Sequence, residues 1–313
     1  MDTIIYTEAD IALISLADMY LYVFRQDHSF QHILGDPRAK EIKESEIADR
    51  WQPTSVKPDD AWGLKGVGPM ALASIHYWRH DIEFCYLDVG AHIGMTTIGR
   101  AIFYKRCGRD NRIFAFEPGN IFQLLQAAVE VNRVADLVMC VQAAVSDTSG
   151  SAQFYLTSGQ SPASSLLADA VHRPEVTQST PIMVNTITID KFLTGSERSS
   201  GILAKIDTEG ADFKVLDGMK ETMSDRLCTL QIEFFPRLVD PYVDPLARLL
   251  ELGRDFYLVD LGSSPHIQIA SENRAIEEFV MRVRTLRPPV TDIFLIPKEL
   301  PDAELLLARI LRE

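Results

Sequence analysis

Strand-like and helix-like segments alternate from Phe84 to the end of the chain. Apolar β-branched and aromatic residues dominate the strand-like runs, and apolar residues recur at helical spacing between Asn120 and Asn132. This alternation is typical of a parallel sheet with helices on both faces. We therefore predict a doubly wound α/β fold with seven strands, at 84–89, 112–116, 138–145, 202–206, 228–233, 256–260 and 292–296.

Two segments depart from this alternation. Residues 148–190 contain two alternating runs around a polar stretch, and we expect them to form an insertion over the carboxyl edge of the sheet. Residues 1–83 are expected to form a helical N-terminal extension to a domain at 84–313. The apolar stretch from Ile11 to Phe24 is interrupted by Asp18 and is shorter than the roughly 20 residues that span a bilayer, so it predicts a packed helix.

Charge and cysteine usage narrow the partners and the compartment. The net charge of −13 would repel phosphate backbones and anionic lipid, so we expect neither nucleic acid nor a membrane as partner. Glu8 and Asp10 stand where a secretory signal would carry basic residues, so no export signal is evident. The four separated cysteines show no metal-binding or disulfide spacing, and buried free thiols favour a cytoplasmic location; they are Cys85, Cys107, Cys140 and Cys228.

A glycine turn follows the first predicted strand of the sheet. The strand ends in Asp88-Val89 and continues as Gly90-Ala91-His92-Ile93-Gly94 into a helix. Ligands bind at this carboxyl edge in open α/β sheets, and Gly90 would permit a close backbone approach while Gly94 would allow the helix to pack near the strand. A turn with a purely structural role is the alternative.

An acidic residue, Glu117, follows the second predicted strand at the same edge. A carboxylate there can accept two hydrogen bonds from a ribose diol, although a solvated carboxylate at a strand end is the plainer interpretation. The turn lacks the G-x-G-x-x-G pattern and the chain lacks a Tyr-x-x-x-Lys pair, so an NAD-dependent dehydrogenase is disfavoured. The two features together predict a nucleotide-like cofactor.

These residues resemble those of methyltransferases of the FkbM family. The similar blocks span about 84–297 and lie at 87–94, 115–118, 144–147, 184–192, 205–212 and 232–233. The resemblance implies a Rossmann-like class I methyltransferase sheet whose last strand is antiparallel. It also implies S-adenosylmethionine as cofactor and methylation of an oxygen of a sugar or secondary metabolite. His92 departs from the Asn common in the family, and Asp212 from the common Glu.

The predicted cofactor-binding residues combine the turn with the similar blocks; they are Asp88, Gly90, His92, Gly94, Glu117, Ala144 and Asp207. Asp207, Glu209 and Glu233 are the predicted catalytic residues, because methyl transfer to a hydroxyl needs positioning and a base at the sheet edge where these carboxylates lie. Alternatively, Asp207 caps the following helix and Glu209 lies in its first turn.

Metal binding is the less favoured interpretation of these residues. Asp207, Glu209 and Glu233 could together hold Mg²⁺, but no spacing typical of a metal site is present, so we predict no metal ligand. His76 and His80 have the i,i+4 spacing of a metal pair without a third ligand nearby. His172 and the Ser164-Ser165 step are further candidates near the acceptor.

The leading hypothesis is an O-methyltransferase acting on a sugar or another small hydroxylated metabolite. N-methylation and a peptide acceptor remain open, and a non-catalytic S-adenosylmethionine-binding protein is the rival from another class. The N-terminal extension is expected to help close the acceptor pocket, and its apolar run could also support a homodimer.

Overall fold

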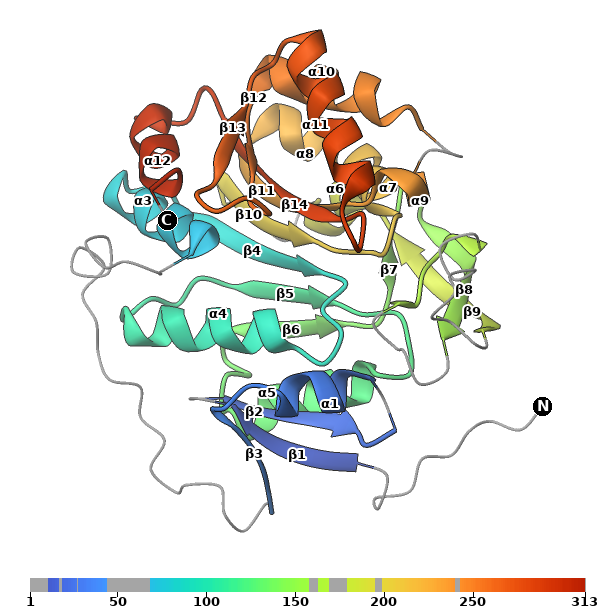
Figure 1. Cartoon of the computed structure of the whole chain (residues 1–313). Helices are drawn as coiled ribbons and strands as arrows, with labels where there is room; N and C mark the ends of the chain where they lie inside the picture. The colour runs from blue at the N-terminus through green and yellow to red at the C-terminus, as the bar shows by residue number, and fades with distance from the viewer. Residues whose placement is uncertain are drawn as a thin grey trace.

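One large mixed sheet organises the chain (Figure 1). The computed structural model describes residues 11–16, 19–26, 28–43, 68–157, 163–168, 179–194, 199–239 and 243–312. The strands of the large sheet are β4 (Phe84–Val89), β5 (Ile113–Phe116), β6 (Val138–Val141), β10 (Gly201–Ile206), β11 (Leu227–Phe234), β12 (Phe256–Asp260), β13 (Ile267–Ile269) and β14 (Thr291–Pro297).

The strand order is β13-β12-β14-β11-β10-β4-β5-β6. Strands β11, β10, β4, β5 and β6 are parallel to one another, whereas β14 is antiparallel to both of its neighbours, β11 and β12. From β4 the chain first adds strands on one side and later, with β10, on the other. The order therefore reverses between β4 and β10, and such a reversal is where open α/β sheets bind ligands.

The predicted α/β sheet is confirmed, but its strand count is eight instead of seven. All seven predicted segments contribute to the large sheet. The segment predicted at 138–145 divides, because β6 ends at Val141 and β7 (Ala144–Val145) joins a separate small sheet. The additional strand, β13, has only three residues and is too short to show a periodic pattern.

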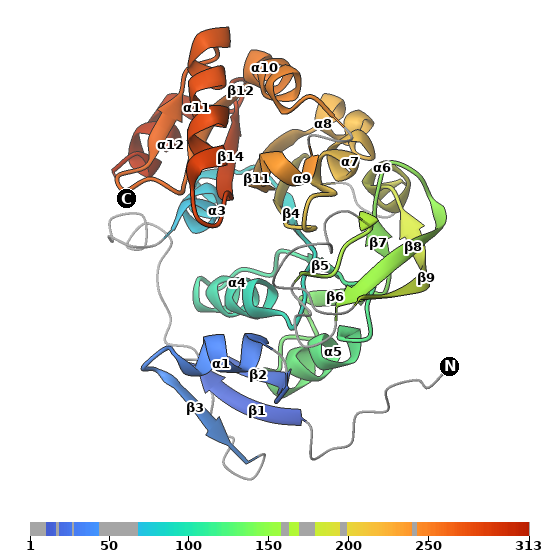
Figure 2. The same ribbon diagram turned by 45° about the vertical axis from the view of Figure 1, so that its right-hand side comes forward.

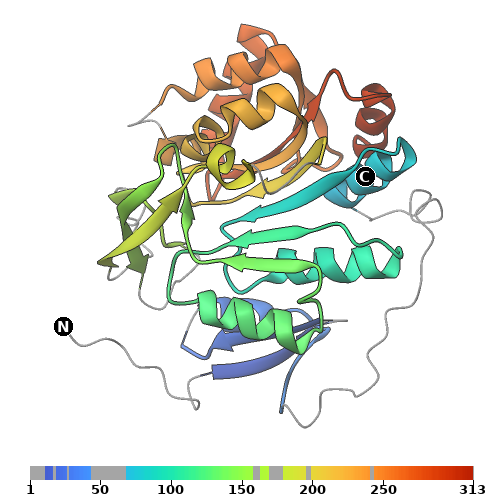
Figure 3. The ribbon, with the colours of Figure 1, turned by 180° about the vertical axis from the view of Figure 1, so that it is seen from behind.

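Helices cover both faces of the large sheet (Figure 3). In β4 the alternate residues Phe84 and Tyr86 pack with one helical layer, and Cys85, Leu87 and Val89 pack with the other. The first layer comprises α3 (Pro69–Arg79), α4 (Met95–Arg106), α5 (Phe122–Val131) and α12 (Ala303–Ile310). The second comprises α6 (Ile189–Leu193), α7 (Asp212–Asp217), α8 (Lys220–Asp225), α9 (Pro236–Val239), α10 (Pro245–Asp255) and α11 (Asn273–Thr285).

The predicted packed helix from Ile11 to Phe24 is wrong, because this part of the N-terminal extension forms strands. Its residues lie in β1 (Ile11–Leu16) and β2 (Met19–Phe24), which pair antiparallel, and β3 (Ala39–Ile42) completes a sheet of order β2-β1-β3. Two helices of the described residues, α1 (His28–Leu34) and α3, also lie within residues 1–83. Tyrosine, valine and phenylalanine in β2 favour a pleated strand over a helix.

The small third sheet contains β7, β9 (Ser179–Ile187) and β8 (Gly150–Thr157), in the order β7-β9-β8 (Figure 2). The two alternating runs of the expected insertion fall in β8 and β9, which pair antiparallel. No helix in the described ranges is long and apolar enough to cross a membrane.

Asn132 joins the N-terminal sheet to the layer of α5. Its side-chain Oδ1 accepts a hydrogen bond from the backbone N–H of Tyr20 in β2 at 2.9 Å. Its Nδ2 donates to the Tyr20 carbonyl at 2.6 Å and to the Ala128 carbonyl at 2.7 Å. The side chain is buried and provides hydrogen-bond partners for the outer edge of β2, beside which the described part of the chain places no further strand.

We expect Asn132→Ala to lower the free energy of unfolding by about 1 to 3 kcal/mol, because the partly buried backbone groups of Tyr20 lose their partner. Hydrogen exchange should rise across β1, β2 and β3. Chemical denaturation and exchange mass spectrometry measure both effects, with exposed Gln126→Ala on α5 as control. Equal stability of the two variants would contradict this account.

Candidate functional site

A cavity of about 290 Å³ lies at the carboxyl ends of β4, β5 and β10, where the strand order reverses. Apolar side chains provide part of the wall, including Phe154 of β8, and charged groups converge on the rest. The lining residues are 89–93, Met95, Thr96, 116–118, 143–145, Phe154, Ser164, Leu166, Lys205 and 207–209. The insertion strand β8 therefore borders the cavity, and the N-terminal sheet contributes none of these residues.

The glycine turn fits between the two strands that flank β4. The N–H groups of Gly90 and Ala91 donate to the Phe116 carbonyl at 3.1 and 2.9 Å. Gly90 has a φ of 81°, and a Cβ at this position would overlap the carbonyl oxygen of Asp207. Only glycine permits both this conformation and this contact, so the predicted close approach occurs between backbones.

His92 adopts the left-handed conformation, with a φ of 53°. Asparagine and histidine are both enriched in this region among non-glycine residues, so this backbone position accepts His92 as readily as the asparagine that the resemblance implies. Gly94 has a φ of 92° and begins α4, and a Cβ there would lie 2.8 Å from the Leu125 side chain. Gly94 therefore shapes the turn from behind the cavity.

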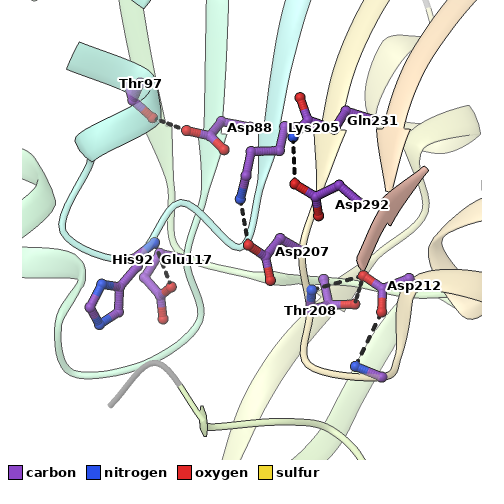
Figure 4. Close-up of polar contacts among 11 residues, drawn as sticks. Asp88, His92, Thr97, Glu117, Lys205, Asp207, Thr208, Asp212, Gln231 and Asp292 are labelled. Atoms are coloured by element: carbon purple, nitrogen blue, oxygen red, sulfur yellow. Dashed lines mark hydrogen bonds and ion pairs between the residues drawn. The ribbon is translucent and has the colours of Figure 1, made fainter. Parts of the chain in front are cut away.

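Glu117 lines the cavity and is almost completely buried, with 7% of its surface exposed (Figure 4). Its Oε2 accepts a hydrogen bond from the His92 N–H at 3.1 Å, and its Oε1 accepts one from the Gly119 N–H at 2.8 Å. Burial raises the pKa of Glu117 to about 7, although these two hydrogen bonds act to lower it. The glycine turn therefore positions the carboxylate directly.

Asp88 is fully buried behind the turn and does not line the cavity. Its Oδ2 accepts a hydrogen bond from Thr97 Oγ1 in α4 at 2.5 Å (Figure 4). Burial raises the pKa of Asp88, while the Lys205 ammonium acts to lower it. This geometry assigns Asp88 to the support of α4 and of the turn.

Lys205 lies inside the cavity wall at the register position beside Asp88. Its Nζ forms an ion pair with Asp207 Oδ2 at 2.6 Å, and its side chain is 18% exposed. Burial acts to lower the pKa of Lys205, but the charges of Asp207 and Asp88 raise it above its ordinary value. Lys205 is not among the site residues predicted from sequence, although a lysine inside an otherwise apolar strand is a signal of a functional position.

Asp212 fixes the loop that follows β10. Its carboxylate accepts hydrogen bonds from the Thr208 N–H at 2.9 Å, the Thr208 hydroxyl at 3.1 Å and the Gly210 N–H at 3.1 Å. Burial, followed by the charge of Asp207, raises the pKa of Asp212 to about 7. Helix α7 begins at Asp212 with Ala211 as its N-cap, so the alternative in which Asp207 caps this helix is wrong.

The structure brings Asp207, Glu209 and Glu233 together. One carboxylate oxygen from each lies within 4.8 Å of the other two. Asp207 and Glu209 line the cavity, whereas Glu233 stands behind them on β11. Burial raises the pKa of Glu233 well above its ordinary value, and the charges of Asp207 and Glu209 add to this effect. The predicted catalytic residues therefore form one cluster at the edge of the cavity.

The remaining sequence candidates lie in different places. Ser164 lines the cavity, and Ser165 Oγ donates to the Glu209 carbonyl at 3.0 Å, so this step contacts the acidic loop. His76 is buried in α3, where its Nε2 lies 2.7 Å from the Pro301 carbonyl oxygen, and its ring packs against that of His80. This pair lies outside the cavity lining, and His172 lies outside the described residues.

Among the predicted cofactor residues, Gly90, His92, Glu117, Ala144 and Asp207 line the cavity. Asp88 and Gly94 support its wall from behind. The cavity therefore combines a glycine turn, a buried carboxylate and a nearby cluster of acids.

Comparisons with solved structures return two methyltransferases and one cofactor-bound protein at low identity. A precorrin-6y C5,15-methyltransferase from Geobacter metallireducens is 11% identical with a TM-score of 0.32, covering 82% of this chain and 96% of that chain. A type I restriction-modification methyltransferase subunit from Streptococcus thermophilus is 11% identical with a TM-score of 0.37, covering 80% of this chain and 53% of that chain. Cofactor-bound Rv0187 from MTB is 12% identical with a TM-score of 0.32, covering 77% of this chain and 87% of that chain.

A comparison with curated proteins gave no match. The model of the methyltransferase FkbM domain matches residues 88–256, which is more than half of the chain and includes the glycine turn, Glu117 and the acidic cluster. The chain belongs to the FkbM methyltransferase family.

Proposed function

We propose that this methyltransferase uses S-adenosylmethionine and methylates an oxygen of a sugar or another hydroxylated secondary metabolite. The observation that carries the proposal is the cavity wall formed by the glycine turn and the buried Glu117. A carboxylate held there by two backbone N–H groups keeps lone pairs for the hydroxyl groups of a ribose. Family membership supports a methyl-transfer reaction at this site.

The polar and apolar parts of the cavity lining suit such a cofactor. Gly90 and His92 of the turn line the cavity beside Glu117, and the apolar wall at Ala144 and Phe154 suits an adenine ring. Gly90, His92, Glu117 and Ala144 would hold the nucleoside part, and Asp207 would lie toward the methyl group. When bound, S-adenosylmethionine supplies an electrophilic methyl group.

The protein's own groups account for acceptor binding and proton removal. Lys205 holds Asp207 in one orientation through the ion pair, and the Asp212 cap fixes the loop that carries Glu209. These carboxylates can orient an acceptor hydroxyl and accept its proton as the oxygen is methylated. Glu233 stands behind them on β11 and completes the cluster.

The wider setting is also part of the proposal. Free cysteines at 85, 107, 140 and 228 favour a reducing, cytoplasmic location. The partner is a small-molecule acceptor, with neither nucleic acid nor membrane involved, because the charge of −13 opposes both. The N-terminal sheet would support a homodimer through its outer strand β3, which has no further strand beside it in the described part of the chain.

We expect Glu117→Ala to weaken binding of S-adenosylhomocysteine by about 1.5 to 3 kcal/mol, or roughly 10- to 150-fold, because charge-assisted hydrogen bonds are lost. Isothermal titration calorimetry measures the affinity, with exposed Glu130→Ala as a control that should match the wild type. Equal affinity of Glu117→Ala and wild type would remove Glu117 from the cofactor site.

Affinity should also depend on pH through Glu117. Its pKa of about 7 means that only a minority of the protein carries the ionised carboxylate at pH 6, whereas most does at pH 8. If the ionised form binds, affinity falls about tenfold from pH 8 to pH 6. Calorimetry at both pH values tests this, and the dependence should disappear in Glu117→Ala. A dependence that persists in the variant would assign it to another group.

Turnover distinguishes the proposed reaction from its rivals. Incubation with methyl-labelled S-adenosylmethionine and a panel of sugars and hydroxylated metabolites should yield S-adenosylhomocysteine and label on an acceptor oxygen. Label on a nitrogen would favour an N-methyltransferase or a peptide-modifying enzyme. Cofactor binding with no turnover across broad acceptor fractions would favour a non-catalytic binding protein.

A further inference from the structure

We propose that Asp207, Glu209 and Glu233 bind one divalent metal ion, Mg²⁺ or Mn²⁺, at the acceptor side of the cavity. This differs from the expectation drawn from sequence spacing, because the three ligands come from separate segments that only the fold brings together. The cluster can bind a metal ion whether or not the protein catalyses methyl transfer. The use of that ion to hold an acceptor rests on the proposed function.

The fold places the three carboxylates on rigid supports. Ile206 and Ile232 are register partners in β10 and β11, so Asp207 and Glu233 occupy the next positions on neighbouring strands. Glu209 follows on the loop that Asp212 fixes by its three accepted hydrogen bonds. The geometry of the cluster is therefore set before any ligand arrives.

The spacing of the oxygens suits a single ion. One oxygen from each residue lies within 4.8 Å of the others. Mg²⁺ binds oxygen at about 2.0 to 2.1 Å and so keeps any two ligands at most about 4.2 Å apart, which means that the three side chains would close slightly around the ion. Mg²⁺ and Mn²⁺ prefer carboxylate oxygens as ligands, whereas softer metals prefer sulfur or nitrogen. One ion can therefore contact all three side chains with little movement.

An unsatisfied atom supplies an independent reason for a cation. Oε2 of Glu233 is buried and has no hydrogen-bond partner within the described part of the chain. A buried carboxylate oxygen without a donor is costly, so such an atom calls for a ligand. Two acids beside the cluster do have donors: Asp292 accepts from Gln231 at 2.8 Å, and Asp212 accepts from the loop that carries Thr208 (Figure 4).

The local charge favours a cation. Three carboxyl groups meet in this cluster, and the Lys205 ammonium forms an ion pair with one of them, Asp207. A cation bound among the three carboxylates would offset their mutual repulsion.

The ion would be accessible from the cavity, because Asp207 and Glu209 line it. Mg²⁺ commonly keeps several positions for water or substrate when only a few carboxylates bind it. Those positions could take two neighbouring hydroxyl groups of an acceptor and present one of them to the methyl donor. The preferred acceptor class is therefore a molecule with adjacent hydroxyl groups.

Manganese titration of the full chain, freed of metal by chelation, tests the site directly. We expect one Mn²⁺ per chain by isothermal titration calorimetry and by loss of the free-ion electron paramagnetic resonance signal. Glu209→Gln and Glu233→Gln should each weaken Mn²⁺ binding at least tenfold. Asp292→Asn is the matched control for general charge, because it removes a nearby carboxylate outside the cluster and should change affinity less than threefold.

Binding of S-adenosylhomocysteine to the same preparations separates this proposal from the preceding one and confirms that the variants fold. Mn²⁺ binding without S-adenosylhomocysteine binding would overturn the proposed function and leave the metal site standing. S-adenosylhomocysteine binding without Mn²⁺ binding would overturn the metal site alone. Equal Mn²⁺ affinity in wild type, Glu209→Gln and Glu233→Gln would also overturn it.

Discussion

The contact between the backbones of Gly90 and Asp207 is the constraint on which the site depends. The turn after β4 has no side chain at Gly90 and therefore lies directly against the carbonyl group that follows β10. On its other side, the N–H groups of the turn bind the Phe116 carbonyl at the end of β5. One glycine thus fixes the relative positions of three strand ends, and Glu117 and Asp207 reach a common cavity because of it.

Buried acidic and basic side chains determine the charge at this edge of the sheet. Burial disfavours the charge on Glu117 and on Glu233, while Lys205 forms an ion pair with Asp207. The side of the cavity at the glycine turn therefore carries an acid that titrates near neutral pH. The other side carries the carboxyl cluster and the Lys205 ammonium. Both sides are held by backbone hydrogen bonds and need little rearrangement to receive a ligand.

The sequence predicted the large sheet well because its strands are short, apolar and separated by clear helices. The boundaries of β4 and of β12 agree to the residue. The prediction from sequence was wrong for β1 and β2. Their apolar run has no clear turn signal and therefore resembles a helix, whereas the pairing between the two strands stabilises a sheet. Local pattern also could not show that Asp88 faces away from the cavity. The approach of Glu233 to Glu209 depends on strand order, which only tertiary structure determines.

The reversal of strand order has a consequence for biosynthesis. The ribosome synthesises β4, β5 and β6 before the insertion. The part of the cavity wall at residues 207–209 follows β10 and is therefore synthesised only after the insertion. During translation the nascent N-terminal half presents the glycine turn and Glu117 without their opposite wall. A cofactor therefore cannot stabilise the early half of the domain, which must rely on its own apolar layer until β10 inserts beside β4.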